Sequence, residues 1–227
     1  MKKLIVTIEA RMNSSRLPGK VMMEVSNKPL LIYLIENLKT ISVLDDIVVA
    51  TTTNTKDDKI CNHLEKLNIS YFRGDEFDVL GRVTKASIKF KADGVIQLTA
   101  DNPLIDPEII KKGINFFFES DFDCVSNTFT RSYPSGMDVS IFKRSFLEFV
   151  SKKAKKEKYR EHVPLYVKEN KNKFKIFEFF AEKKVYRPDI SFTVDEESEF
   201  ETIKKIIEHF KSKPISCKDL INFIEDK

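Results

Sequence analysis

The chain has 227 residues, with 39 basic and 35 acidic side chains and a formal net charge of +4. At 33% charged and 41% hydrophobic residues it is not a disordered chain, and it is long enough to bury a sizeable core in one large or two small domains. Six glycines, where average usage would give about 16, exclude collagen-like and glycine-rich linker material. The mild charge, with both signs interspersed, gives no indication of a nucleic-acid partner.

Cysteine usage and the first residues exclude further classes. Cys61, Cys124 and Cys217 are scattered and form no CxxC pair, which argues against a disulfide framework or a zinc site and predicts reduced thiols in the cytoplasm. The N-terminal apolar run is short, alternates with polar residues and meets Glu9 and Arg11, so we expect a strand there and no signal peptide. No apolar stretch approaches the ~20 residues that a membrane-spanning helix needs.

Strand-like and helix-like segments alternate up to about residue 120. Runs rich in β-branched residues predict strands, and apolar residues spaced three and four apart predict helices. The expected strands are 4–8, 46–53, 69–72 and 94–99, and the expected helices are 29–38, 57–67, 79–90 and 107–118. This alternation predicts βαβ units and a mostly parallel sheet whose strands all end at one edge.

Beyond residue 120 the pattern is mixed. We expect strands at 124–126, 137–142 and 174–181, a turn at 133–136, and helices at 144–156, 160–169, 198–210 and 218–224. No linker separates these parts from the first half. The sequence therefore predicts an α/β fold with one domain over residues 1–227, in which about 130–190 form an inserted or appended subregion.

Ligands of an open α/β sheet bind beyond the carboxyl ends of its strands. That rule selects the loops 10–20, 73–82 and 100–106 and the segment around Asp195. The first loop, ARMNSSRLPGK, places Arg11, Arg16 and Lys20 directly after the first strand. Three cations and exposed backbone N–H groups suit a polyanion such as a nucleoside triphosphate, although the loop lacks the GxxxxGK[ST] pattern of a Walker A motif. The alternative is a solvated basic loop.

Six segments in chain order resemble one family. They are ARMNSSRLPGK at 10–20, RGDEFDVLGR at 73–82, TADNPLIDPE at 99–108, YPSGMDV at 133–139, REHVPLY at 160–166 and FTVD at 192–195. The set, spread over about residues 3–210, resembles the cytidylyltransferase family of spore-coat polysaccharide biosynthesis protein F, which is related to the CMP-Kdo (3-deoxy-octulosonate) and CMP-acylneuraminate synthetases. The resemblance implies a Rossmann-like three-layer nucleotidyltransferase fold and, because the related synthetases are commonly dimers, a homodimer that uses the 130–190 subregion for acceptor or dimer contacts.

In that family the first loop holds the triphosphate and the base. The resemblance implies that the nucleotide contacts Ala10, Arg11, Met12, Ser14, Arg16, Lys20, Arg73 and Asp101. Of these, Arg11, Lys20 and Asp101 are expected to be catalytic, with Lys20 neutralising charge on the departing pyrophosphate. Gly19 is expected to let the turn approach the phosphates closely.

Two aspartates follow predicted strands and are the candidates for a metal site. Asp101 follows the strand 94–99, and Asp195 ends the apolar run FTVD. Mg²⁺ takes few protein carboxylates and completes its octahedron with phosphate oxygens and water. The resemblance implies that Asp101 and Asp195 hold a catalytic Mg²⁺. The alternatives are a plain turn at Asp101 and a helix N-cap at Asp195.

The acceptor site is less sharply defined. The candidates are Arg82, Gln97, Asp138, Arg160 and His162, the last of which lies where the Kdo synthetases have an acceptor-contacting histidine. Four of them also have a structural alternative: pairing of Asp78 with Arg82 at i,i+4, a buried amide at Gln97, strand capping by Asp138, and a structural hydrogen bond at His162. The chain departs from the expected family pattern at Gln97, Ala100 and Asn102, which leaves the acceptor open.

These features predict a nucleotidyltransferase that activates a sugar or acidic keto-sugar with CTP and releases pyrophosphate, for the synthesis of a surface polysaccharide or glycan. An acceptor oxygen would attack the α-phosphorus in line, so that catalysis consists mainly of positioning and electrostatic stabilisation. Two alternatives remain. One is a transferase of guanylyl or another nucleotidyl group to a sugar 1-phosphate. The other is a nucleotide-sugar-dependent glycosyltransferase, against which the absence of a DxD motif at a strand end counts.

Overall fold

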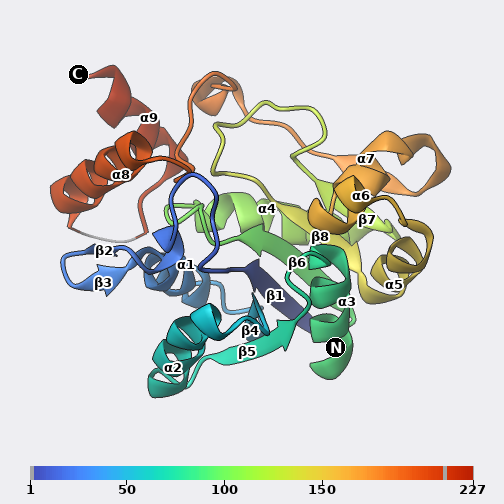
Figure 1. The fold of residues 1–227 in the computed structure, drawn as a ribbon. Helices are drawn as coiled ribbons and strands as arrows, with labels where there is room; N and C mark the ends of the chain where they lie inside the picture. Colours follow the sequence, from blue (N-terminus) through green and yellow to red (C-terminus); the bar gives the residue numbers. More distant parts are fainter. Residues whose placement is uncertain (1–2, 212–213, 227) are drawn as a thin grey trace.

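The computed structural model describes residues 3–211 and 214–226, and a seven-stranded sheet forms its centre (Figure 1). The strand order is β5-β4-β1-β6-β8-β7-β9. The strands are β1 (Leu4–Glu9), β4 (Asp46–Thr52), β5 (Ser70–Gly74), β6 (Gly94–Thr99), β7 (Cys124–Ser126), β8 (Ser140–Lys143) and β9 (Ile176–Glu178). A separate hairpin joins β2 (Glu24–Val25) to β3 (Lys28–Pro29).

The first half of the sheet is parallel, as the alternation of strands and helices predicts. β1 pairs with β4 on one side and with β6 on the other, and β5 extends the sheet beyond β4. The central strands are near-continuous runs of buried residues, which is typical of strands covered by helices on both faces. Their carboxyl ends therefore meet at one edge of the sheet.

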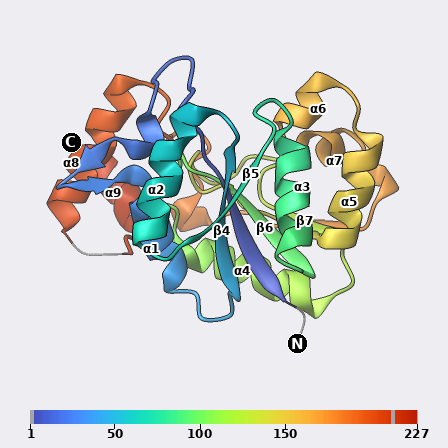
Figure 2. The ribbon, with the colours of Figure 1, turned by 60° about the horizontal axis from the view of Figure 1, so that its bottom comes forward.

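Two apolar clusters cover the two faces. One contains side chains from α1 (Leu30–Lys39), α2 (Asp58–Lys66), α4 (Pro107–Glu119), α8 (Glu197–Phe210) and α9 (Cys217–Glu225). The other contains side chains from α3 (Val79–Lys89), α5 (Arg144–Lys153), α6 (Glu157–Glu161) and α7 (Leu165–Glu169). Figure 2 shows α3 and α5 side by side on their flank of the sheet. No helix within 3–211 or 214–226 is long and apolar enough to cross a bilayer.

The second half of the sheet is mixed. β8 runs antiparallel to β6 and β7, and β9 runs parallel to β7. The α/β class, with a mostly parallel sheet and a mixed subregion, is thus confirmed.

Several predicted bounds in this half are wrong. The strand expected at 137–142 begins only at Ser140, as β8. Before it, the Asn127 side chain donates to the Met137 carbonyl and accepts from the Val139 N–H (2.7 and 2.8 Å), in place of a neighbouring strand. The helix expected at 160–169 is broken into α6 and α7, since Pro164 cannot continue a helix that precedes it. The helix expected at 144–156 ends at Lys153, and the strand expected at 174–181 shrinks to β9.

The hairpin of β2 and β3 was not expected from the sequence. Its two central residues, Ser26 and Asn27, have φ of 52° and 62°. Two consecutive residues with positive φ make the tight turn that suits the twist of paired strands, and asparagine tolerates this conformation better than most residues. The strands have only two residues each, too few for an alternation of polar and apolar side chains to be recognised.

Candidate active site

The loop after β1 is fixed to the strand ends by a buried carboxylate. Asp57 accepts a hydrogen bond from the Met12 N–H (2.7 Å) and further bonds from the N–H and hydroxyl of Thr52 at the end of β4. Gly19 closes the loop with a hydrogen bond from its N–H to the Met12 carbonyl (2.8 Å), and its φ of +78° is one that a side chain disfavours. The predicted turn at Gly19 is therefore present, and Met12 anchors the loop through its backbone.

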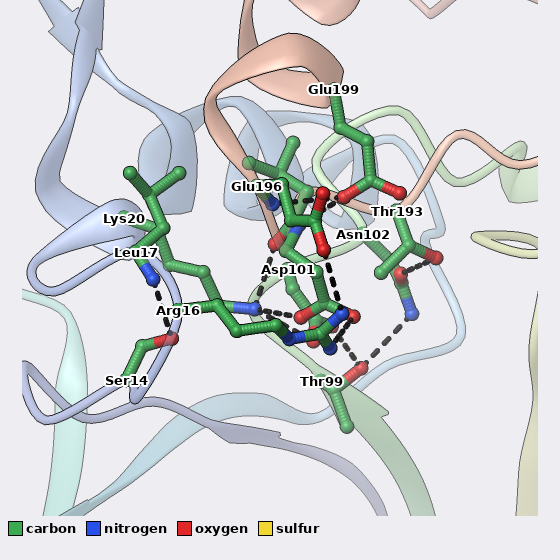
Figure 3. Close-up of polar contacts among 12 residues, drawn as sticks. Ser14, Arg16, Leu17, Lys20, Thr99, Asp101, Asn102, Thr193, Glu196 and Glu199 are labelled. Carbon is green, nitrogen blue, oxygen red and sulfur yellow. Dashed lines mark hydrogen bonds and ion pairs between the residues drawn. The ribbon is translucent and has the colours of Figure 1, made fainter.

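Lys20 joins this loop to both aspartates predicted as metal ligands. Its Nζ lies 2.6 Å from Asp195 Oδ1, 3.2 Å from Asp101 Oδ2 and 2.7 Å from the Val194 carbonyl oxygen. Figure 3 shows Lys20 and Arg16 reaching from the loop toward Asp101. Side chains that are far apart in the sequence therefore meet at the carboxyl end of the sheet, where the strand-end rule places a ligand site.

Asp195 is held in place by backbone contacts of the residues that precede it. The Val194 N–H donates to the Asp101 carbonyl (2.8 Å), and the Phe192 N–H donates to the Ser135 carbonyl (2.8 Å). Gly136 permits the second contact, because a Cβ at this position would lie 2.9 Å from the Phe192 carbonyl carbon. The YPSGMDV motif thus packs against the segment before Asp195, which is in turn hydrogen-bonded to Asp101, just beyond the end of β6.

The Asp195 carboxylate is directed at cations and does not cap a helix. Arg16 donates to its Oδ2 (2.7 Å), and Lys20 donates to its Oδ1. Burial alone would raise the pKa of Asp195, but the hydrogen bonds and charges of Lys20 and Arg16 lower it below its ordinary value. At the start of α8, the Glu199 carboxylate accepts hydrogen bonds from the N–H groups of Asp195 and Glu196 (2.6 and 2.9 Å). The alternative of an N-cap at Asp195 is therefore excluded.

A chain of side-chain hydrogen bonds orients Asp101. The Thr99 hydroxyl donates to Asp101 Oδ1 (2.5 Å) and accepts from the Asn102 amide (2.9 Å), while Thr193 donates to the Asn102 amide oxygen (3.0 Å). Asn102, one of the departures from the family pattern, thus connects the end of β6 to the segment that carries Asp195. Thr99 and Thr193 are not among the site residues predicted from the sequence.

The two carboxylates fit the donor set of a magnesium site. Each carboxylate directs an oxygen at the Lys20 ammonium, which lies between them. A position between two carboxylates that accommodates an ammonium group also suits a metal cation. Within the described residues no cluster of three Asp, Glu, His or Cys side chains forms a closed metal cage. Most ligands of a Mg²⁺ ion here would therefore be phosphate oxygens and water, as that ion prefers.

A cavity of about 370 Å³ opens beside this cluster, over the strand ends. Nine of the predicted site residues line it: Ala10, Arg11, Ser14, Arg16, Lys20, Arg82, Asp101, His162 and Asp195. They come from the first loop, from α3, and from the segments that follow β6, follow α6 and precede α8. The volume lies in the range of small-molecule sites, which occur at this edge of α/β sheets.

The other five predicted residues lie outside the cavity wall: Met12, Arg73, Gln97, Asp138 and Arg160. Arg73 donates to the carbonyls of Thr52 and Asn54 (2.7 and 2.8 Å) and to Asp58 (2.6 Å), so it fastens the end of β4. Asp138 pairs with Arg131 at 3.1 Å. These placements do not favour direct contacts of Arg73 or Asp138 with substrate.

Two arginines near the cavity are already bonded to protein groups. Arg82, 2% exposed, donates to the carbonyls of Ala50 (3.1 Å) and Asp75 (2.7 Å), and burial lowers the pKa of its guanidinium. Arg160 binds Asp78 (2.6 Å). The alternative pairing of Asp78 with Arg82 is thus not present, because the Asp78 carboxylate forms its ion pair with Arg160 instead.

Glu9 also lines the cavity, and it is not among the site residues predicted from the sequence. It is the last residue of β1 and accepts a hydrogen bond from Gln97 Nε2 on β6 (2.8 Å). Burial raises the pKa of Glu9 to about 7, and the charge of Asp101 adds to the rise while Arg82 opposes it. The strand-end rule that selected Asp101 applies equally to Glu9, and would have identified it.

Comparisons with known proteins agree with this geometry. The family model described as cytidylyltransferase matches residues 5–220. An uncharacterized protein of Methanocaldococcus jannaschii is 34% identical over 98% of this chain and 90% of its own length. Spore coat polysaccharide biosynthesis protein SpsF of Bacillus subtilis is 29% identical over 99% of this chain and 95% of its own.

Solved structures give the same result for the fold. A cytidylyltransferase from Leptospira borgpetersenii superposes with a TM-score of 0.94 at 34% identity, covering 100% of this chain and 95% of that one. A CMP:2-keto-3-deoxy-manno-octonic acid synthetase solved with CTP superposes with a TM-score of 0.69 at 16% identity, covering 92% of this chain and 99% of that one, and supports the fold alone. The match of the family model along almost the whole chain, together with this architecture, shows that the protein belongs to the cytidylyltransferase family.

Proposed function

We propose that this protein transfers a cytidylyl group from CTP to an oxygen of a sugar or acidic keto-sugar and releases pyrophosphate. The observation that carries the proposal is the convergence of Lys20, Asp101 and Asp195 at the strand ends, beside a cavity lined by the basic loop. Membership of the cytidylyltransferase family favours CTP, and the likeness to SpsF favours a product for surface polysaccharide synthesis.

The charges of the cluster suit phosphoryl chemistry. Lys20 and Arg16 would bind the β- and γ-phosphates, where their charge stabilises the departing pyrophosphate. Asp101 and Asp195 would hold Mg²⁺, which neutralises charge on the phosphates when it is bound. Thr99 keeps Asp101 in position through its hydroxyl. No protein nucleophile is needed, because the reaction is a direct displacement at phosphorus.

The choice of nucleotide and reaction class is tested by pyrophosphate release. The purified protein is incubated with Mg²⁺, one of CTP, GTP, UTP or ATP, and a panel of sugars, sugar 1-phosphates and keto-sugar acids. We expect release with CTP and an acceptor, and a CMP- or CDP-linked product in mass spectrometry. Turnover of GTP or another triphosphate in place of CTP would replace the cytidylyl proposal. A parallel incubation supplies nucleotide-sugars in place of the triphosphates; consumption of a nucleotide-sugar there, with no triphosphate turned over, would identify a glycosyltransferase.

A homodimer and a cytoplasmic location are part of the same proposal. The first follows from the related synthetases, and the second follows from the three unpaired, buried cysteines. Sedimentation equilibrium of the full chain tests the dimer, and cell fractionation tests the location.

A further inference from the structure

The positive charge of the protein is concentrated in one stretch of the chain. Residues 144–175 carry 11 basic and four acidic side chains, a net charge of +7, whereas the whole chain has a net charge of +4 and the remainder is therefore net acidic. Nine of the 11 basic side chains are lysines, and all nine are exposed. We call them the lysine patch: Lys152, Lys153, Lys155, Lys156 and Lys158 in a first run, and Lys168, Lys171, Lys173 and Lys175 in a second.

The fold places the two lysine runs side by side. Lys158 on α6 is paired with Glu169 at the end of α7 (2.6 Å), which joins the end of the first run to the start of the second. Phe149 on α5 packs against Phe174, with 6.1 Å between the ring centroids, and the Lys153 ammonium lies 5.9 Å from the Phe149 ring. Figures 1 and 2 show α5, α6 and α7 together at one end of the molecule, away from α8 and α9.

Most of the lysine patch is not neutralised by the protein. Three of its lysines form ion pairs, with Glu169, Glu178 and Asp121. The other six form no ion pair within the part of the chain that the structure describes: Lys152, Lys153, Lys155, Lys156, Lys168 and Lys173. Because like charges on one flank sum to a positive potential, this flank attracts an extended anionic partner.

The composition of the patch favours a diffuse anionic surface over a single shaped anion. The two arginines of the same stretch are bound to the protein, since Arg144 donates to the Ala92 carbonyl (2.7 Å) and Arg160 to Asp78 (2.6 Å). Lysine ammonium groups attract negative charge without the bidentate geometry of a guanidinium. Phe149, 42% exposed, adds an apolar ring among them. Lysines around an exposed aromatic ring suit the charged and apolar layers at a bilayer surface.

We propose that the lysine patch binds the surface of a bilayer that contains anionic lipids. Each ammonium group close to such a surface adds a favourable interaction, which falls off within a Debye length. A second copy of the protein presenting the same face would be repelled by it. The proposal goes beyond the transfer of a cytidylyl group and does not depend on it, because none of the nine lysines lines the cavity at the strand ends.

Sedimentation with lipid vesicles tests the proposal. The protein is mixed with vesicles of phosphatidylcholine alone, or with vesicles in which about a third of the lipid is phosphatidylglycerol, at about 0.05 and 0.5 M NaCl. We expect binding to the anionic vesicles only, and its loss at the higher salt concentration. A variant with Lys152→Gln, Lys153→Gln, Lys155→Gln and Lys156→Gln should bind these vesicles about tenfold more weakly or less, because four charges of the patch are lost.

The matched control removes four exposed lysines from α2, α8 and α9, with Lys59→Gln, Lys66→Gln, Lys205→Gln and Lys218→Gln. It has the same net charge as the patch variant, but its binding to anionic vesicles should fall less than about threefold, because screening confines the effect to charges near the lipid. Both variants should keep the circular dichroism spectrum of wild type, since all eight side chains are exposed.

Three results would overturn the proposal. The first is that wild type does not bind the anionic vesicles at the lower salt concentration, or binds uncharged vesicles equally well. The second is that the control variant loses as much binding as the patch variant, which would show a response to net charge alone. The third is that a DNA duplex binds through these lysines more tightly than the anionic vesicles do, which would assign the patch to nucleic acid.

Discussion

The two ends of the cavity differ in how their charges are neutralised. At the end near α8, Lys20 and Arg16 are paired with the carboxylates of Asp101 and Asp195, which are partly exposed to the cavity. At the end near α3, Arg82 is bound to backbone carbonyls and the nearby carboxylate of Glu9 to an amide. Side-chain ion pairs can be exchanged for phosphates and a metal ion without loss of fold, whereas buried backbone contacts cannot. The first end is therefore suited to exchange its ion pairs for a charged ligand, whereas the contacts of Arg82 and Glu9 at the second end belong to the fold.

The largest expected effect on turnover comes from a substitution at the end of the cavity near α8. Asp195→Asn removes one of two carboxylates that would hold Mg²⁺, so turnover should fall by roughly 10³-fold or more. The circular dichroism spectrum should stay that of wild type, because Val194 and Glu199 fix the local backbone independently of the carboxylate. The measurement is kcat for pyrophosphate release at saturating CTP and Mg²⁺. Near-normal turnover would remove Asp195 from the metal site.

Lys20→Met tests the cation that lies between the carboxylates. Loss of its charge should lower kcat by roughly 10²–10³-fold, because one stabilising contact to the departing pyrophosphate is lost. It should also tighten the binding of Mg²⁺ alone, measured by calorimetry, since the lysine no longer competes with the ion for Asp101 and Asp195. Weaker Mg²⁺ binding in this variant would show that Lys20 does not occupy the place of the metal.

Ionisation of Glu9, at the end of the cavity near α3, makes the stability of the folded protein depend on pH. Its pKa is about 7 in the folded protein against an ordinary value of 4.5, so between these values the folded state holds more protons than the unfolded state. The stability contributed by this group therefore falls as pH rises from about 4.5 to 7. Glu9→Gln, which carries no charge, should melt a few degrees higher than wild type at pH 8, with the gain lost near pH 4.5. An equal difference at both pH values would contradict the raised pKa.

Gly19→Ala should have the smallest effect. The left-handed backbone costs a residue with a side chain about 1–2 kcal/mol, and the loop is held by Asp57 through Met12 in either case. We expect a modest fall in melting temperature and a weaker CTP affinity. A variant with unchanged stability and unchanged affinity would show that the loop does not need this conformation.

How much of the fold could be predicted differs between the two halves of the sheet. In the parallel half, strands buried on both faces are long apolar runs, and β6 was predicted with its bounds. In the mixed half the strands have three or four residues and end where side chains take over their hydrogen bonds, as Asn127 does beside Val139. Such contacts between distant residues have no signature in the local sequence.

The candidate site shows the same limit. The strand-end rule and the family motifs select Lys20, Asp101 and Asp195, and the fold places the three side chains in contact because strand ends converge whatever the loop details. The same motifs could not show that Arg73 and Arg160 are bonded to protein groups, since their partners are fixed only by the packing of the folded chain. The environment of Glu9 likewise depends on its burial beside Gln97 and Arg82, which becomes visible only in three dimensions.

The central claim is that the α-phosphate of CTP moves to the acceptor. The most direct test is a reaction with Mg²⁺, a sugar acceptor and CTP labelled at the α-phosphate, followed by separation of the products. We predict that label appears in a cytidylyl-linked sugar with one unlabelled pyrophosphate released for each product, and that neither forms with Asp195→Asn. Label that stays in free CDP or CMP regardless of the acceptor, or a sugar that gains the γ-phosphate instead, would contradict the account.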